Sequence, residues 1–422
     1  MLHALEVGIS CLVNLMKELF NKWTSISLVK RILCGLVIGV ILGLACPKAT
    51  GIAILGDVFV GALKAIAPIL VFFLVISSLC NGGKSHSGVI KTVIILYMLS
   101  TFLAALIAVI SSTLFPVNLT LAEAATETAA PQGIVEVLQS LLMNIVSNPV
   151  NSLANANYIG ILSWAVLLGI SFRAAGDATK KMLQDISAGI SKVVTWIINF
   201  APFGILGLVF NTVSTNGLDI FTEYGKLLAV LVGSMLFIYF VTNPILVYWC
   251  IRQNPYPLIF KCLKRSAITA FFTRSSAANI PINMEVCQEM GLDKDTYSVT
   301  IPLGATINMD GAAITITVMT LATAHTLGIS VDIPTAIILS ILATLSACGA
   351  SGVAGGSLLL IPMACSLFGI PNDVAMQVVG VGFIIGVVQD SVETALNSSS
   401  DLLLSASAEF REWRKQGKKI VF

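Results

Sequence analysis

Six apolar segments, each long enough to cross a lipid bilayer as a helix, dominate the first 250 residues. They are residues 28–46, 55–80, 88–115, 155–175, 183–212 and 223–251. A membrane-spanning helix needs about 20 mainly apolar residues. Only 11% of the 422 residues are charged, against roughly 25% in soluble domains. A water-soluble globular enzyme is therefore excluded, and we expect an all-α polytopic membrane protein.

Charged residues between these segments predict the orientation of the chain. Basic residues lie before the first segment and after the second, fourth and sixth, whereas acidic residues follow the third and fifth. Short loops rich in Lys and Arg stay on the cytoplasmic side. We therefore expect a multi-pass protein of the cytoplasmic (inner) membrane with both termini in the cytoplasm. A net charge of +2 gives no indication of a nucleic-acid partner.

Two later apolar stretches are interrupted and do not resemble ordinary spans. Residues 266–283 contain Thr-Arg-Ser-Ser at 273–276, and residues 333–369 consist of two apolar halves around the Gly/Ser-rich segment 346–357. Runs of 10–14 apolar residues are too short to cross a bilayer. We expect two re-entrant helical hairpins, each followed by a crossing helix, in an inverted repeat. Such paired interruptions mark the binding site of a transporter.

The crossing helices, over residues 296–324 and 374–408, carry carboxylates in apolar surroundings. From 295 to 410 the chain has neither Lys nor Arg. One carboxylate at the bilayer centre costs about 2.5–3.5 kcal/mol or more, so Arg274, protons or bound metal cations must neutralise the group. The carboxylates are Asp310, Asp390, Glu393 and Asp401.

One face of the last helix is polar. At about 100° per residue, five positions share an arc of roughly 100°. Thr394 or Asn397 alone could simply bond one helix to another, but three carboxylates would repel one another unless a cation or Arg274 lies between them. We interpret the face as functional, because ionisable residues within a membrane usually are. The five residues are Asp390, Glu393, Thr394, Asn397 and Asp401.

Further oxygen-bearing residues accompany these carboxylates. Gly304 and Gly311 flank Asn308 and Asp310, and glycines can unwind a helix and free carbonyl oxygens, which hard cations prefer. Three hydroxyls share one face of the third span, although hydroxyls also commonly bond back to their own helix. They belong to Tyr97, Ser100 and Thr101. The first hairpin offers hydroxyls and a half-helix N-terminus suited to a substrate carboxylate.

These motifs resemble the dicarboxylate/amino acid:cation symporter family, which has the glutamate-transporter fold. The resemblance covers essentially the whole chain and implies eight transmembrane helices plus the two hairpins, sodium as coupling ion and a homotrimer in the lipid bilayer. Four segments carry it: Arg274-Ser-Ser, Gly304-Ala-Thr-Ile-Asn-Met-Asp-Gly311, Gly349-Ala-Ser-Gly-Val-Ala-Gly355 and Asn397-x-x-x-Asp401.

The resemblance also implies a scaffold and a moving transport domain, which together give alternating access. The scaffold would comprise residues 1–81, with an N-terminal amphipathic helix and helices 1–2, and residues 132–215, with helices 4–5. The transport domain would comprise 88–115 (helix 3) and 223–409 (helix 6, hairpin 1 at 256–291, helix 7, hairpin 2 at 333–369 and helix 8). Residues 410–422 would form a basic cytoplasmic tail.

Binding residues follow from the same resemblance, position by position. One sodium site would use Asp401 with carbonyls of Gly304, Asn308 and Asn397. A second would use carbonyls of Thr306, Ala347, Cys348 and Ala350. A third would use Tyr97, Ser100, Thr101, Asn308 and Asp310. The substrate site would consist of Ser275, Ser276, the backbone around Val353, Asp390, Glu393, Thr394 and Asn397, with Asp390 receiving the substrate amine.

One departure from the family pattern bears on the substrate. Relatives that transport acidic substrates carry Arg where this chain has Glu393, and Thr where it has Ala312. A bidentate arginine would hold a side-chain carboxylate, whereas Glu repels it, so aspartate and glutamate are disfavoured. The chain resembles the serine/threonine:sodium branch of the family. Glu393 could accept a hydrogen bond from a substrate hydroxyl, or form a salt bridge with Arg274.

We therefore expect a symporter of small neutral hydroxyl amino acids, serine and threonine, and not an enzyme. Proton coupling or a dicarboxylate substrate within the same fold remains an alternative. An intramembrane aspartyl enzyme would pair Asp310 with Asp401 around a shared proton, but the surroundings rich in oxygen and glycine suit a cation better. An ion channel would use the hairpins as its filter.

Overall fold

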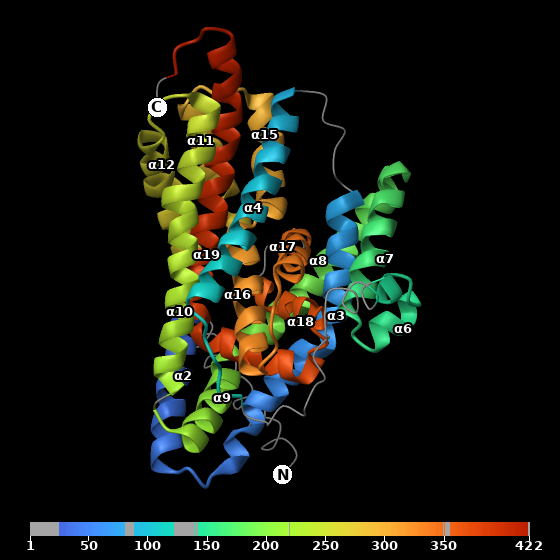
Figure 1. Cartoon of the computed structure of the whole chain (residues 1–422), viewed down its shortest axis with the longest axis vertical. Coiled ribbons are helices and arrows are strands. Elements are labelled where there is room, and N and C mark those ends of the chain that lie inside the picture. Colours follow the sequence, from blue (N-terminus) through green and yellow to red (C-terminus); the bar gives the residue numbers. More distant parts are fainter. Residues whose placement is uncertain are drawn as a thin grey trace, which may run out of the picture. The chain divides into compact units, whose positions relative to one another are not determined.

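The computed structural model is all-helical over the residues that it describes, with no strand among them (Figure 1). The all-α class is thus confirmed. The predicted amphipathic helix at the N-terminus and Val353 lie outside the described residues. The structure describes residues 25–80, 88–121, 139, 142–218, 220–348, 350 and 355–420.

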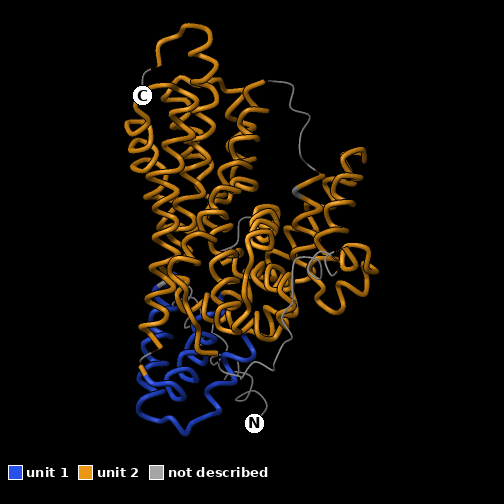
Figure 2. The backbone as a smooth tube through the Cα atoms, in the orientation of Figure 1, with its two compact units in different colours: residues 1–59, 199–217 blue, residues 60–198, 218–422 orange. Residues whose placement is uncertain are grey.

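The chain forms two compact units (Figure 2). One consists of residues 1–59 and 199–217, and the other of residues 60–198 and 218–422. These units follow from packing within one conformation. The division into a scaffold and a transport domain stays a prediction.

In the first unit, α2 (Leu28–Ala45) packs closely along α9 (Ala201–Asn216). Three glycines of α2, spaced four residues apart, face the α9 backbone. A Cβ atom on Gly39 would lie 2.7 Å from the Leu206 carbonyl oxygen, and one on Gly43 would lie 3.0 Å from Cβ of Val213. Small residues at this spacing let two helix backbones approach within a membrane. The third is Gly35, against the Pro202 carbonyl.

The second unit begins within α3 (Ile54–Cys80) and continues through α4 (Gly88–Leu114), α6 (Pro149–Ala154), α7 (Tyr158–Ser171) and α8 (Asp177–Asn199). Two short 3-10 turns, η1 (Thr50–Ile52) and η2 (Phe172–Ala174), flank α3 and α7. The predicted segments 28–46, 55–80 and 88–115 match α2, α3 and α4 closely. The predicted single segment 183–212 is wrong in one respect: it is two helices, α8 and α9, because Pro202 has no amide to continue the first.

The sixth predicted segment, 223–251, is a long helical segment with a π-helical turn in its middle. It runs through α10 (Ile220–Phe237), the π-helical turn η3 (Ile238–Thr242) and α11 (Asn243–Ile251). Pro244 stands just after the π turn. A proline lacks an amide and clashes with the preceding turn, and the wider π turn accommodates it.

The segment predicted as hairpin 1 is divided into two helical arms at Arg274 and Ser275. The first arm contains α12 (Tyr256–Cys262), the π turn η4 (Leu263–Ala267) and α13 (Ile268–Thr273), and the second arm is α14 (Ser276–Glu289). Arg274 ends α13 with a left-handed backbone (φ 53°). Ser275 then caps α14, because its Oγ accepts the Ala278 amide at 3.2 Å.

The crossing helix predicted over 296–324 is broken into α15 (Lys294–Ile307) and α16 (Asp310–Thr326). The break at Asn308 and Met309 lies between Gly304 and Gly311. The predicted unwinding in this glycine-flanked segment is thus confirmed.

Hairpin 2 consists of α17 (Ile333–Ala347), then the 3-10 turn η5 (Gly356–Leu360) and α18 (Ile361–Ser366). Residues 349 and 351–354 of its predicted tip lie outside the described residues. The last helix, α19 (Asn372–Lys415), is 44 residues long and includes the first part of the predicted basic tail. It packs against α4, α10, α11 and α13–α16.

Five stretches of the described residues are long and apolar enough to cross a membrane, and α8 with α9 could form a sixth. They contain α3, α4, α10 with α11, α15 with α16, and α19. The chain is therefore a multi-pass membrane protein.

Candidate functional site

Four buried carboxylates lie where α16 and α19 meet α4 and the hairpins. Each side chain is at most 5% exposed, although the sequence around them is apolar. Asp310 is the first residue of α16, directly after the break in the crossing helix. The other three carboxylates lie on the polar face of α19. The four are Asp310, Asp390, Glu393 and Asp401.

Asp310 is held by hydroxyls of α4. Ser100 Oγ lies 2.8 Å from Asp310 Oδ2, and Thr101 Oγ1 donates to Oδ1 at 3.2 Å. Ser100 Oγ is also 3.1 Å from Asn243 Oδ1, and the Asn243 amide donates to Ser400. No Lys, Arg or His within the described ranges pairs with Asp310. This carboxylate is thus surrounded by neutral oxygen groups, as a bound cation would need.

Asp401 lies beside the end of α15. Its Oδ1 accepts the Asn308 side-chain amide at 2.9 Å, and its backbone carbonyl accepts the Tyr97 hydroxyl at 2.9 Å. A Cβ on Gly304 would come within 2.8 Å of Asp401 Oδ1, so only glycine leaves room for the carboxylate. The side-chain oxygen of Asn308 is buried without a hydrogen-bond partner. It is an acceptor that a cation could use.

The break between α15 and α16 leaves carbonyl oxygens without their usual donors. The Met309 amide donates to Thr101 Oγ1 at 3.3 Å, and the Gly311 amide donates to Asn397 Oδ1 at 2.7 Å. In a continuous helix these amides would bond to the carbonyls of residues 305 and 307. The predicted carbonyl of Gly304 accepts the Asn308 amide at 2.9 Å, so it has one remaining lone pair.

The second predicted sodium set brings two helix C-termini together. Cys348, which ends α17, places its Sγ 3.7 Å from the carbonyl of Ile307, the last residue of α15. The Ala347 carbonyl accepts the Ala350 amide at 2.9 Å, and the Thr306 hydroxyl bonds back to Leu303. Helix C-termini carry partial negative charge. Two of them at one place favour a cation.

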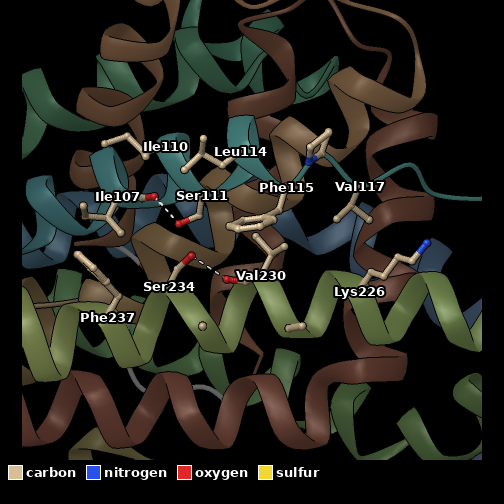
Figure 3. Close-up of a pocket in the computed structure, with 13 residues that line it drawn as sticks. Ile107, Ile110, Ser111, Leu114, Phe115, Val117, Lys226, Val230, Ser234 and Phe237 are labelled. Carbon is tan, nitrogen blue, oxygen red and sulfur yellow. Dashed lines mark hydrogen bonds between the residues drawn. The ribbon is translucent and has the colours of Figure 1, made fainter.

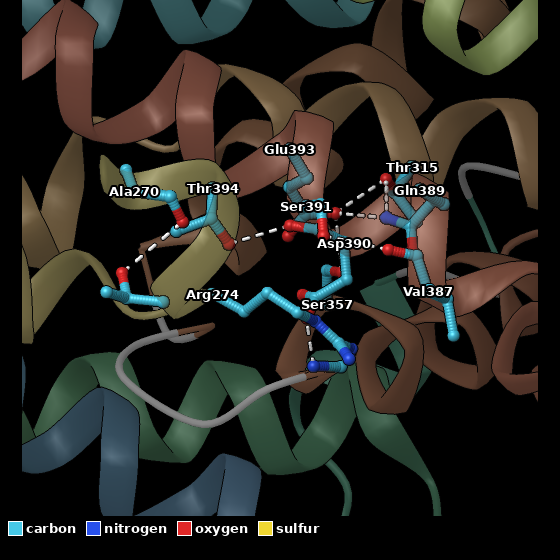
Figure 4. A network of polar contacts seen from close by, with 12 residues as sticks. Ala270, Arg274, Thr315, Ser357, Val387, Gln389, Asp390, Ser391, Glu393 and Thr394 are labelled. Carbon is cyan, nitrogen blue, oxygen red and sulfur yellow. Dashed lines mark hydrogen bonds and ion pairs between the residues drawn. The ribbon is translucent and has the colours of Figure 1, made fainter. Parts of the chain in front are cut away.

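Arg274 neutralises one of the four carboxylates, as the sequence predicts, and that one is Asp390. Its Nε and Nη2 both lie 2.6 Å from Asp390 Oδ2 (Figure 4). The Gly355 amide of hairpin 2 donates to Asp390 Oδ1 at 3.1 Å. The alternative salt bridge between Arg274 and Glu393 is not formed in this structure. Arg274 therefore links the tip of hairpin 1 to α19, with hairpin 2 on the other oxygen.

Glu393 is held by neutral donors instead (Figure 4). One oxygen, Oε2, receives Thr315 Oγ1 at 2.7 Å, Ser357 Oγ at 2.8 Å and Gln389 Nε2 at 2.5 Å. These donors come from α16, hairpin 2 and α19. They fix the carboxylate while its other oxygen makes no hydrogen bond to the described residues.

Three of the remaining predicted substrate residues use their side chains in hydrogen bonds with the protein backbone. Thr394 bonds back to the Asp390 carbonyl at 2.7 Å, and Asn397 accepts the Gly311 amide. Ser275 serves as the cap of α14, next to the nearly buried Ser276. The structure thus brings the tip of hairpin 1 to Asp390, and ties Asn397 to the break before α16.

Sequence reasoning missed several partners of these groups. Asn243 and Ser400 support the Asp310 cluster, and Thr315, Ser357 and Gln389 hold Glu393. One signal was present, because an Asn inside the apolar run 223–251 is a polar group that needs a partner in a membrane. Thr315 and Ser357 gave no such signal, since single hydroxyls are common in apolar helices.

Metal-binding side chains do not gather as they would in a transition-metal centre. Within the searched part of the chain, no three His, Cys, Asp or Glu residues lie close enough to hold one ion. The donors at hand are single carboxylates with hydroxyl, amide and backbone oxygens. Unwound backbone carbonyls and half-helix ends of this kind coordinate sodium in transporters.

Broken helices with buried carboxylates at their ends are typical of a secondary transporter. The chain matches the sodium:dicarboxylate symporter family over residues 28–409. It belongs to this family, and is a transporter and not an enzyme.

The chain is also similar to proteins named serine/threonine transporter SstT in three strains of Streptococcus thermophilus. In each case 58% of residues are identical over 401 aligned residues, which is 95% of this chain and 100% of the relative. The family predicted from the sequence motifs is confirmed.

Proposed function

We propose that this chain imports serine and threonine across the cytoplasmic membrane by symport with sodium. The observation that carries the substrate class is Glu393, which stands where the motif of acidic-substrate relatives has Arg. Its similarity to transporters named for serine and threonine supports the same substrates. The family name supports sodium as the coupling ion.

Glu393 would select for a hydroxyl and against a second carboxylate. Three donors fix its Oε2, and its Oε1 is left to accept a hydrogen bond from the substrate. A substrate carboxylate placed here would meet like charge in a medium of low dielectric, where repulsion is strong. Serine and threonine gain a hydrogen bond, whereas aspartate and glutamate are repelled.

The amino-acid backbone of the substrate would bind at Asp390 and hairpin 1. Asp390 receives the substrate amine in place of the Arg274 guanidinium that occupies it here. Thr394 and Asn397 complete this side of the site. The substrate carboxylate lies at Ser275 and Ser276, where the N-terminus of the 14-residue helix α14 carries partial positive charge. The backbone around Val353 would cover the substrate from hairpin 2.

Sodium would neutralise Asp310 and Asp401, two of the three carboxylates that lack a basic partner. At Asp310 the ligands are Tyr97, Ser100, Thr101 and Asn308. At Asp401 they include carbonyls of Gly304, Asn308 and Asn397. A further ion would bind the carbonyls of Thr306, Ala347, Cys348 and Ala350. The uncompensated charge of Asp310 and the unpartnered oxygen of Asn308 support this assignment.

The proposed cycle is alternating access in a homotrimer. Eight transmembrane helices and two hairpins cross or enter the membrane, with both termini in the cytoplasm. Sodium orders the break between α15 and α16, and substrate then closes hairpin 2 as the outer gate. The transport domain moves against the scaffold. Each net positive charge carried inward gains about 2.3 kcal/mol per 100 mV.

Uptake into liposomes tests the proposal. Purified protein should accumulate labelled serine above its outside concentration only with an inward sodium gradient, and unlabelled threonine should compete while aspartate does not. Replacement of sodium by choline with an inward proton gradient serves as control. Equal uptake under that control would establish the proton-coupled alternative, and competition by aspartate would establish a dicarboxylate substrate. Serine flux that only equilibrates would favour a channel.

A further inference from the structure

A groove outside the candidate binding site lies between the end of α4 and α10 (Figure 3). Its volume is about 850 Å³. Ile107, Ile110 and Leu114 line it from α4, and Val230 and Phe237 line it from α10. Nothing in the proposed transport cycle uses this space.

The walls of the groove are apolar in effect. Two serines line it, but Ser111 Oγ donates to the Ile107 carbonyl at 2.8 Å and Ser234 Oγ donates to the Val230 carbonyl at 2.7 Å (Figure 3). Each hydroxyl proton is therefore used within its own helix. A polar ligand would find few partners along these walls, whereas a hydrocarbon chain would lose nothing by binding there.

One end of the groove carries a positive charge. Lys226 is the charged residue among the lining residues, and it forms no ion pair with any residue that the structure describes. Glu223, one turn earlier on α10, accepts the Thr120 amide at 3.0 Å and its hydroxyl at 2.9 Å. This contact holds the segment after α4 against the start of α10, next to the Lys226 end.

The length of the groove matches one leaflet of a bilayer. Lys226 and Phe237 lie on the same helix, and at 1.5 Å per residue their positions are about 17 Å apart. One half of the hydrocarbon core of a bilayer is about 15 Å thick. A lipid with its phosphate at Lys226 would therefore extend an acyl chain along the full groove to the middle of the membrane.

We propose that this groove binds one anionic phospholipid, with an acyl chain between α4 and α10 and its phosphate at Lys226. The proposal goes beyond the transport function and does not depend on the identity of the substrate or the coupling ion. It requires one bound lipid per chain, held by apolar contacts along the groove and by the charge of Lys226. The lipids that surround any membrane protein are bound less tightly.

Two glycines of α10 provide matched variants. A Cβ on either Gly233 or Gly225 would meet no atom within 4 Å. Gly233 lines the groove and Gly225 does not. Gly233→Phe should fill the groove without disturbing the packing, and Gly225→Phe adds the same side chain elsewhere. Lys226→Gln removes the charge alone.

Native mass spectrometry with added phosphatidylglycerol tests the proposal on the purified full-length transporter. Wild-type protein and Gly225→Phe should retain one lipid per chain. Gly233→Phe should bind it roughly tenfold more weakly, as the loss of about two methylene contacts predicts. Lys226→Gln should weaken the binding of phosphatidylglycerol about fivefold, the effect of one Lys near a membrane surface, and leave the binding of diacylglycerol, which has no phosphate, unchanged.

Each other outcome would overturn the proposal. Retention by Gly233→Phe equal to that of Gly225→Phe would place the lipid elsewhere. Wild-type protein without a stoichiometric lipid would leave the groove to another occupant, such as the segment after α4 or a second copy. If Lys226→Gln weakened the binding of both lipids equally, Lys226 would not be the residue that binds the phosphate. Monodisperse elution of each variant confirms that the fold is intact.

Discussion

Two helix pairs of this protein make contact in opposite ways. In the glycine seam, Gly35, Gly39 and Gly43 of α2 press against the backbone of α9, and no polar side chain takes part in these contacts. In the polar seam, α16 meets α19 through Glu393, Asn397 and their partners, beside the carboxylates of Asp310 and Asp401. Both pairs lie in an apolar sequence, yet only the second has carboxylates at its contact.

The difference separates packing from binding. A glycine seam needs only close approach, since backbone contact supplies its stability. The polar seam places carboxylates where each costs several kcal/mol, and Asp310 has only neutral partners among the described residues. Such a seam is unfavourable by itself and becomes favourable when a cation binds. We therefore expect mutations in the two seams to act on different measurements.

The largest effect should come from Asp401→Asn in the polar seam. Loss of this charge should raise the sodium concentration for half-maximal serine uptake roughly 100-fold, equivalent to about 2.7 kcal/mol. Asp185→Asn is the matched control, because Asp185 is exposed and forms a surface ion pair with Lys181. The measurement is serine uptake across a sodium series. An unchanged sodium requirement in Asp401→Asn would remove this residue from the ion site.

A smaller effect is expected from Gly39→Ala in the glycine seam. The new Cβ would lie 2.7 Å from a backbone oxygen that cannot turn away, and overpacking of this kind costs about 1–3 kcal/mol. The midpoint of thermal unfolding should fall while the sodium requirement stays the same. Gly61→Ala is the control, since its Cβ meets nothing. Equal midpoints for the two variants would show that the seam is not closely packed.

Glu393→Gln should act on substrate selectivity alone. Gln keeps the size of the side chain but is a weaker acceptor, so the affinity for serine should fall about tenfold, or about 1.4 kcal/mol. Alanine, which has no hydroxyl, should bind as before and serves as the control ligand. Glu393→Arg should also weaken serine and admit aspartate. If serine and alanine change together, Glu393 does not contact the hydroxyl.

The smallest effect should come from Glu289, outside both seams. Arg265 donates two hydrogen bonds to this half-exposed carboxylate at 2.7 and 2.8 Å and lowers its pKa. Because the folded pKa lies below the unfolded one, the pair stabilises the fold above the unfolded value. That contribution is lost as the pH falls through the folded pKa.

Glu289→Gln should therefore lower the unfolding midpoint slightly at neutral pH, and the difference from wild type should shrink as the pH falls below about 4. Thermal unfolding at two pH values measures it. A difference that grows in acid would contradict the assigned direction of the pKa shift.

The polar seam shows how far sequence reasoning reaches. The tip of hairpin 1 at Arg274 and the break between Gly304 and Gly311 could be predicted, because a short apolar run or a pair of glycines is a local signal. The carboxylate that pairs with Arg274 could not, since Asp390 and Glu393 share one arc of α19. Their partners come from α13, α16 and hairpin 2, and only tertiary packing decides between them.

The helix ends illustrate the same limit. Hydropathy predicts one span over the apolar run 183–212. Pro202 lies within this run, and α9 begins one residue before it. Hydropathy averages over a window and does not register a missing amide. Conversely, α4 matches its predicted segment closely, because polar residues precede its start at Gly88 and Pro116 follows its end at Leu114.

The central claim is that sodium bound at the polar seam moves together with the substrate. The most direct test is the uptake of radioactive sodium into liposomes that contain the purified transporter, with and without external serine. We predict that serine starts sodium influx in a fixed ratio to its own uptake, and that Asp401→Asn loses this influx at sodium concentrations that half-saturate the wild-type protein. Serine uptake without sodium influx, or with proton influx in its place, would contradict the account.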